Sequence, residues 1–157
     1  MKNRKNILKI LLDTTFILPT LGINVGKEIE NGIRKLEKIE AELYYSRFSI
    51  LESLWIAVRL TKDQSFDTER FNQGLRSIIE GGRYIRVEED YRIFRDALKL
   101  YTLGHSDMID NILYATSVNY DLKLLTVDKE LKGFIQTKKL KKHTHITRPD
   151  QHMRRRL

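Results

Sequence analysis

The chain has 157 residues, of which 41% are hydrophobic, with 8 glycines and 2 prolines; this excludes a disordered or collagen-like protein and indicates one domain with a buried core. It has no cysteine, which excludes disulfides, thiolate chemistry and zinc–thiolate sites. Lys and Arg number 29 against 21 Asp and Glu, and the net charge of +8 favours a polyanionic partner, with a basic surface that serves solubility alone as the alternative.

The first predicted element is a strand over residues 6–12, a nearly continuous apolar run that ends at Asp13. Such a run is typical of a buried central strand in a parallel sheet. If the run is continued to residue 21, Lys9, Asp13 and Pro19 interrupt it, so it is no membrane span. It also lacks the small-residue cleavage site of a secretory signal, and we therefore expect a cytoplasmic protein.

The middle of the chain alternates between helical and strand-like patterns. Apolar residues at three- and four-residue steps predict an amphipathic helix over 27–43, and β-favouring residues follow at 44–48. Ser49 and Glu52 have the spacing of a capping box, which predicts that a helix begins at Ser49. A further helix is predicted over 67–79, closed by two glycines, and then a short strand over 84–87.

The last third of the chain repeats this alternation. Helices are predicted over 90–103 and, with Ser106 as the capping residue, over 106–120. A second buried strand is predicted over 122–127, followed by Asp128, a short helix over 129–134 and an edge strand over 145–147. We expect a single domain over 1–147 and a basic, flexible tail over 148–157.

Strands that alternate with helices indicate an α/β domain with a mostly parallel sheet. In such sheets, functional sites lie beyond the carboxyl ends of the strands, which is where Asp13 and Asp128 stand. Glu52 and Asp110 lie on the adjoining predicted helices. Each of the four has a purely structural alternative, for example Asp128 as a helix cap and Glu52 as half of the capping box. Together they can converge, and a cluster of carboxylates is suited to Mg²⁺ or Mn²⁺.

Four short motifs follow one another in the chain. Hydrophobic residues precede Asp13-Thr14-Thr15, and Ser49 stands three residues before Glu52. Asp110 is followed by apolar residues and Ala-Thr-Ser, and Asp128 ends the run Leu-Leu-Thr-Val-Asp. In this order the motifs resemble those of the PIN domain, the nuclease fold of VapC-type toxins and RNA-processing enzymes. The resemblance implies a three-layer α/β/α sandwich around a mostly parallel sheet of four to five strands.

The resemblance also implies a function. It indicates a metal-dependent endoribonuclease that hydrolyses RNA phosphodiesters, with Asp13, Glu52, Asp110 and Asp128 as catalytic residues and as ligands of Mg²⁺ or Mn²⁺. Thr15 and Thr126 would orient these ligands by hydrogen bonds. Asp107, one helical turn before Asp110, is a further candidate for supporting the ligands in this way.

The biological role is open at this point. The first hypothesis is a VapC-type toxin with RNA as substrate, a homodimer, and an antitoxin protein as partner. The alternatives are a housekeeping RNA-processing nuclease and a non-catalytic RNA-binding module with the same fold.

Overall fold

The computed structural model describes residues 6–141, which form four strands and seven helices. The elements in chain order are β1 (Leu8–Leu12), α1 (Thr14–Ile17), α2 (Lys27–Lys38), β2 (Ala41–Tyr45), α3 (Arg47–Leu60), α4 (Thr68–Ile79), β3 (Ile85–Arg86), α5 (Tyr91–Thr102), α6 (Met108–Asn119), β4 (Lys123–Leu125) and α7 (Lys129–Thr137).

The strands form one parallel sheet in the order β3-β2-β1-β4. The chain moves outward from β1 to β2 and β3, and then returns to place β4 on the other side of β1. The direction of winding therefore reverses between β1 and β4. In open α/β sheets, the carboxyl end of such a reversal point is where ligands bind. A ligand site is therefore expected beside the residues that follow β1 and β4.

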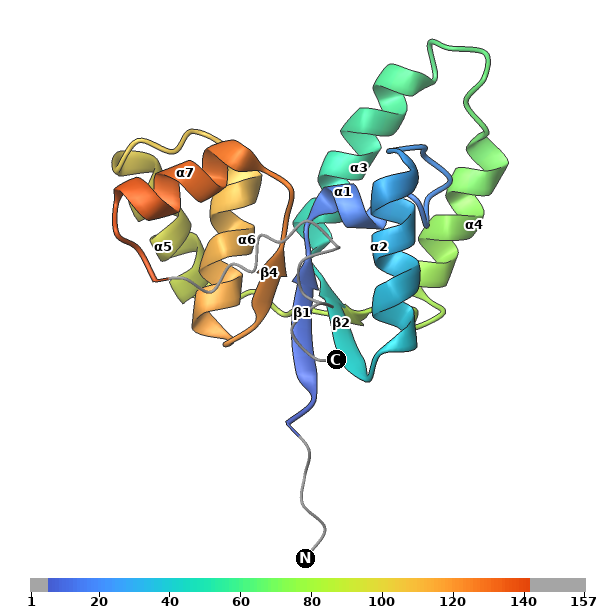
Figure 1. Ribbon diagram of the computed structural model, residues 1–157. Helices are drawn as coiled ribbons and strands as arrows, with labels where there is room; N and C mark the ends of the chain where they lie inside the picture. The colour runs from blue at the N-terminus through green and yellow to red at the C-terminus, as the bar shows by residue number, and fades with distance from the viewer. Residues whose placement is uncertain (1–5, 142–157) are drawn as a thin grey trace, which may run out of the picture.

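Helices cover both faces of the sheet, which gives the predicted three-layer α/β/α sandwich (Figure 1). Alternate residues of β1 point to opposite faces, as the pleat of a strand requires. Ile10 and Leu12 pack in the core on the side of α1 to α4, whereas Leu11 packs with residues of α6 and α7 on the other side. A smaller apolar cluster joins α5 to α6. Burial on both faces explains why β1 is almost continuously apolar.

Helix α4 approaches the chain after α1 very closely, and a glycine makes this approach possible. A side-chain carbon added at Gly74 would lie 2.3 Å from the carbonyl oxygen of Thr20 and 2.8 Å from Cα of Leu21. The guanidinium of Arg70 donates a hydrogen bond to the same Thr20 oxygen. Phe71 and Ile78 of α4 enter the core beside this contact. The distance between α4 and the segment after α1 is therefore fixed by backbone contact.

Four helix boundaries differ from those predicted, and one of them is the end of α7, which extends to Thr137 instead of residue 134. Helix α2 ends at Lys38, and residues 41–45 form β2, because Leu43 pairs with Ile10 of the central strand. Helix α3 begins one turn earlier than expected, with Ser46 as the capping residue, whose Oγ accepts a hydrogen bond from the Phe48 N–H. The capping box predicted from Ser49 was therefore wrong. Helix α6 is capped by Asp107 and not by Ser106.

The predicted edge strand at 145–147 and the basic tail at 148–157 lie outside the described residues. Across residues 6–141, no helix is both long enough and apolar enough to cross a membrane.

Candidate functional site

Two aspartates lie where the winding of the sheet reverses. Asp13 directly follows β1, and its N–H donates a hydrogen bond to the carbonyl of Leu125 in β4. Its side chain is buried, with 7% of the residue exposed. Asp128 follows β4 and begins α7, where Oδ1 accepts a hydrogen bond of 2.8 Å from the Leu131 N–H. The cap expected for Asp128 is thus present, and it occupies one of the two carboxylate oxygens.

Thr126 connects these two aspartates. Its hydroxyl donates a hydrogen bond of 2.6 Å to Oδ2 of Asp13 and accepts one of 3.0 Å from the Asp128 N–H. The threonine is almost fully buried. Because Leu12 pairs with Leu125, Thr126 stands beside Asp13 as a direct result of the register between β1 and β4. The register therefore sets the spacing between the two acidic loops.

Glu52 reaches the same edge of the sheet from α3. Its Oε2 accepts a hydrogen bond of 2.5 Å from the hydroxyl of Thr14, the first residue of α1. Sequence reasoning favoured Thr15 for a supporting role and missed Thr14. Thr15 does line the cavity described below, but the contact with a carboxylate that the structure gives is made by its neighbour. A signal was present, since Thr14 directly follows Asp13 and carries the same hydroxyl group as Thr15.

Asp110 and Asp107 come from the first turn of α6. Asp107 caps this helix, and its carboxylate accepts a hydrogen bond of 3.1 Å from the Asp110 N–H. Asp107 is exposed, whereas Asp110 has only 9% of its surface exposed. Residues 110–117 of α6 are all buried, because this helix lies between α5 and the sheet. Asp110 is therefore held in a fixed, largely dry position.

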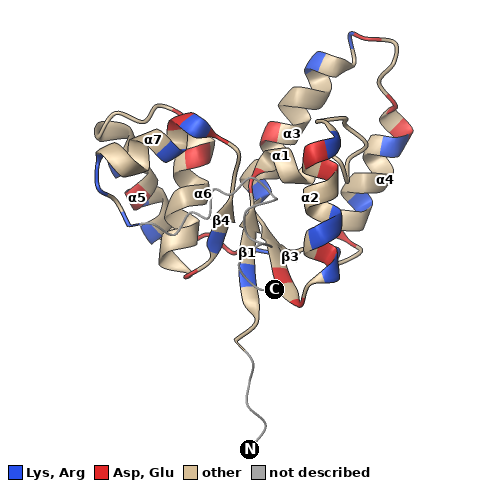
Figure 2. Cartoon of the chain, in the orientation of Figure 1, with Lys and Arg blue, Asp and Glu red and all other residues tan. Residues whose placement is uncertain are grey.

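The four predicted ligands and Asp107 line one cavity of about 150 Å³, which we call the acidic cavity. Figure 2 shows acidic segments at the starts of α3, α6 and α7, around the same edge of the sheet. The remaining lining residues are apolar or hydroxyl-bearing, and none of the lining residues in the described chain is basic. The side chains that line the acidic cavity are those of Asp13, Thr14, Thr15, Leu18, Glu52, Ile56, Asp107, Asp110, Val127 and Asp128.

Burial and crowding of like charges change the acidity of two of these groups. Burial raises the pKa of Asp13 from 3.8 to about 6; the hydrogen bond from Thr126 opposes this shift, and the charges of Glu52 and Asp128 add to it. Burial also raises the pKa of Asp110 to about 8, with further contributions from the charges of Asp13, Asp107, Asp128 and Glu52. Burial and the neighbouring negative charges therefore raise the free energy of a charged carboxylate in the acidic cavity.

The donor set is chemically suited to a hard cation. Every polar side chain in the acidic cavity offers oxygen, and oxygen ligands are those that Mg²⁺ and Mn²⁺ prefer. Within residues 6–141, no three His, Asp or Glu side chains are arranged so that they could hold a metal ion as they stand. The carboxylates thus share a cavity and interact electrostatically without the spacing of a closed coordination sphere.

A second cavity, of about 240 Å³, is larger but lacks a comparable cluster. It lies over the sheet and is lined by Lys9, Tyr44, Arg86, Glu88 and Tyr120, among others. Its one carboxylate, Glu88, is paired with Arg86. Groups of opposite charge neutralise each other here, whereas in the acidic cavity like charges converge. The smaller, acidic cavity is therefore the better candidate for a functional site.

The protein is thus an α/β protein whose candidate site is a cluster of carboxylates beyond the carboxyl ends of its central strands. Sequence comparison identifies its family. Residues 10–137 match the PIN domain family, and the chain belongs to it. The matched range contains all the residues of the acidic cavity. Among curated proteins, none matches the sequence significantly. The PIN-like fold expected from the four motifs is thus confirmed.

Solved structures of similar fold come from toxin–antitoxin systems. A toxin–antitoxin complex from Klebsiella pneumoniae is similar with a TM-score of 0.59 and 16% identity, over 88% of this chain and 97% of the other. FitAcB from Neisseria gonorrhoeae is similar with a TM-score of 0.53 and 17% identity, over 81% of this chain and 93% of the other. DNA-bound VapBC from Salmonella typhimurium is similar with a TM-score of 0.54 and 16% identity, over 81% of this chain and 92% of the other. At these identities the likeness is one of fold.

Proposed function

We propose that this protein is a metal-dependent endoribonuclease and that it acts as the toxin of a VapC-type toxin–antitoxin pair. The observation that carries the proposal is the acidic cavity, in which Asp13, Glu52, Asp110 and Asp128 converge without a basic neighbour. A protein that used these residues only for structure would gain stability by pairing them with Lys or Arg, of which the chain has 29. The uncompensated charge is suited to a divalent cation.

Asp13, Glu52, Asp110 and Asp128 would hold Mg²⁺ or Mn²⁺, with Asp128 using the oxygen that is free of the helix cap. When bound, such an ion polarises phosphoryl oxygens and lowers the pKa of a water molecule. Thr126 and Thr14 orient Asp13 and Glu52 by hydrogen bonds, so that their oxygens stay directed toward the cavity. Asp107 fixes the first turn of α6, which carries Asp110.

RNA is the proposed substrate because the chain combines this cavity with a net charge of +8. Lys and Arg residues lie along α2 and α4 in Figure 2, on the outside of the sandwich. They supply attraction to a phosphate backbone away from the acidic cavity, which by itself repels phosphate. Binding would thus depend on basic residues and cleavage on acidic ones.

The proposed protein partner is an antitoxin. This rests on two of the similar structures: the one from Klebsiella pneumoniae is a toxin–antitoxin complex, and VapBC from Salmonella typhimurium is bound to DNA. Co-expression with the product of the neighbouring gene tests it directly. A small DNA-binding protein that co-purifies with this chain and suppresses its RNA cleavage is the expected result. No such partner, together with cleavage of one precursor RNA, would favour the housekeeping nuclease.

A second copy of the chain is the other proposed partner, because two neighbouring helices expose apolar side chains. The two helices meet where α3 begins, since the rings of Phe48 and Phe94 pack edge to face there with centroids 5.6 Å apart. Eight large side chains at roughly 100 Å² each amount to about 800 Å², which is what a stable dimer buries on each partner. The eight are Leu51, Leu54, Trp55 and Val58 of α3 and Tyr91, Phe94, Leu98 and Tyr101 of α5.

Cleavage of structured RNA with Mg²⁺ or Mn²⁺, with a chelator as control, tests the catalytic proposal. Asp13→Asn keeps the size and the hydrogen bond to Thr126 but removes a charge. We expect it to abolish cleavage and to leave RNA binding unchanged or slightly tighter, because one repulsive charge is lost. Glu69→Gln, an exposed change on α4, is the matched control and should cleave normally.

Two results would contradict the proposed catalytic activity. Equal cleavage by the parent and by Asp13→Asn would identify a contaminating nuclease. RNA binding without metal-dependent cleavage, across several classes of RNA, would favour the non-catalytic binding module.

A further inference from the structure

Helix α3, which carries Glu52, is held in an unusual way. The residues of this helix that are fully buried are small, namely Ser49, Ser53 and Ala57. Larger apolar side chains of α3 are half-buried on its flank, and those on its outer face are exposed. Ile50, Ile56 and Leu60 thus hold α3 by partial apolar packing only. A polar contact at the start of α3 adds to this packing in setting the direction in which Glu52 points.

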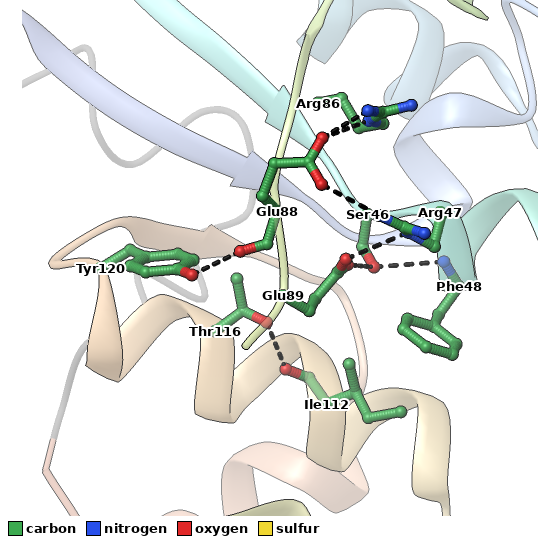
Figure 3. A network of polar contacts seen from close by, with 9 residues as sticks. All are labelled: Ser46, Arg47, Phe48, Arg86, Glu88, Glu89, Ile112, Thr116 and Tyr120. Atoms are coloured by element: carbon green, nitrogen blue, oxygen red, sulfur yellow. Dashed lines mark hydrogen bonds and ion pairs between the residues drawn. The ribbon is translucent and has the colours of Figure 1, made fainter. Parts of the chain in front are cut away.

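That contact is made by Glu89, which lies between β3 and α5 and has a side chain only 1% exposed. Its Oε1 accepts a hydrogen bond of 2.5 Å from the Ser46 hydroxyl, and its Oε2 lies 3.3 Å from Nε of Arg47 (Figure 3). Ser46 is the capping residue of α3, and Arg47 is the first residue of the helix. A negative charge at this end is also favoured by the helix dipole.

Glu89 is itself rigidly held. The N–H of Val87 bonds to Tyr45 of β2, and the hydroxyl of Tyr120 donates to the backbone carbonyl of Glu88. Asp90 caps α5. The residues on either side of Glu89 in the chain are therefore tied to a strand or a helix, and the Glu89 carboxylate contacts the start of α3 from this position.

The carboxylate carries an energetic cost that an apolar residue would avoid. A buried charge is favourable only when its partners are complete, and Glu89 Oε2 accepts no hydrogen bond in the described chain. Arg47, its ion-pair partner, is more than half exposed and also contacts Glu88. A leucine at position 89 would fill the same space without this cost, so stability alone does not account for the glutamate.

We propose that Glu89 is a positioning residue that sets the rotation of α3 and so directs Glu52 into the acidic cavity. Glu52 lies between one and two helical turns beyond Ser46. With a side chain reaching ~6 Å from the helix axis, a rotation of ~20° would move its carboxylate by ~2 Å. That displacement breaks the 2.5 Å hydrogen bond from Thr14 and takes an oxygen out of reach of a cation. This inference rests on the proposed metal-dependent function.

The test measures Mn²⁺ affinity by calorimetry and the melting temperature of the metal-free protein. Glu89→Leu removes the contact and fills the space, and Glu88→Gln is the matched control, since Glu88 also pairs with Arg47 but is exposed. We expect Glu89→Leu to weaken Mn²⁺ binding at least about tenfold while the melting temperature stays equal or rises. Glu88→Gln should change neither quantity. Equal Mn²⁺ affinity in Glu89→Leu and the parent would overturn the inference.

A second comparison separates positioning from general damage. In a Glu52→Gln background, Glu89→Leu should cause no further loss of Mn²⁺ affinity, because it acts through Glu52. A further loss of Mn²⁺ affinity of the same size would show that Glu89 does not act through Glu52, and would overturn the inference. If Glu89→Leu does not fold, Ser46→Ala removes the same contact from the other side and must weaken Mn²⁺ binding in the same way. A parent protein that binds no Mn²⁺ at all would instead refute the proposed function, which is a distinguishable result.

Discussion

Replacing Asp110 by Asn should stabilise the metal-free protein and change how its stability depends on pH. The native pKa of Asp110 is about 8, whereas in the unfolded chain its ordinary value of 3.8 applies. At pH 7 the native carboxyl is therefore protonated and the unfolded one is ionised. The unfolded pKa lies about three pH units below pH 7, and this interval corresponds to roughly 4 kcal/mol of lost stability at pH 7. Water at the mouth of the cavity weakens these interactions, so we expect Asp110→Asn to recover about 2 kcal/mol or more.

The sign of the pH dependence follows from proton binding. Between the unfolded and native pKa values the native state binds one more proton than the unfolded state, so stability falls as pH rises through this window. For Asp110 the fall is about 1.4 kcal/mol per pH unit between pH 6 and pH 7, and it ends near pH 8. Asp13, whose native pKa is about 6, adds to the fall below pH 6.

Urea unfolding and thermal melting of the parent and Asp110→Asn at pH 5, 6, 7 and 8, with a chelator present, measure both effects. We expect the two proteins to diverge in stability as pH rises, with a melting temperature for Asp110→Asn at pH 7 roughly 4 to 8 °C higher. Stability that is constant or rises in the parent from pH 6 to pH 8 would refute the reasoning. So would parallel curves for the two proteins, because Asp110 would then titrate normally.

Three further predictions follow from the same structure. Mg²⁺ or Mn²⁺ should raise the melting temperature of the parent by occupying the acidic cavity, and a calorimetric scan that is unchanged by millimolar metal would count against the site. Gly74→Ala should destabilise the protein by about 2 kcal/mol in urea unfolding, because the added carbon meets backbone atoms. Gly133→Ala in α7 is the control, because its added carbon meets no other atom, and it should stabilise the protein by about 0.5–1 kcal/mol. Equal effects of the two substitutions would refute the packing argument. The parent should be a dimer by light scattering at micromolar concentration and Trp55→Glu a monomer, so a monomeric parent would exclude the proposed interface.

The elements that could be predicted from sequence are those whose pattern has one physical explanation. The apolar run of β1 and the glycines after α4 gave the correct type of element in nearly the correct place. The boundary between α2 and β2 could not be predicted, because the four-residue step from Ile39 to Leu43 is compatible with a continuing helix. Only the pairing of Leu43 with Ile10 makes this segment a strand, and that pairing is a long-range contact.

The acidic cavity shows a similar division. Two buried strands ending in aspartate were enough to predict that Asp13 and Asp128 would share one edge of the sheet. The positions of Asp110 and Glu52 depended on family motifs, since a helix can present a carboxylate to solvent as easily as to a cavity. Thr14 and Glu89 escaped prediction because their partners lie 38 and 43 residues away along the chain. No local pattern reports such contacts.

Asp128 serves two purposes with its two oxygens, and this limits which residues could replace it. One oxygen caps α7, and the other is free for the acidic cavity. Asp128→Ala would remove the cap as well as the charge, and its effect on the proposed RNA cleavage could not be separated from damage to α7. Asn or Ser would keep the cap and lose only the charge. At position 128, Asn or Ser would therefore leave α7 capped while the acidic cavity loses one negative charge.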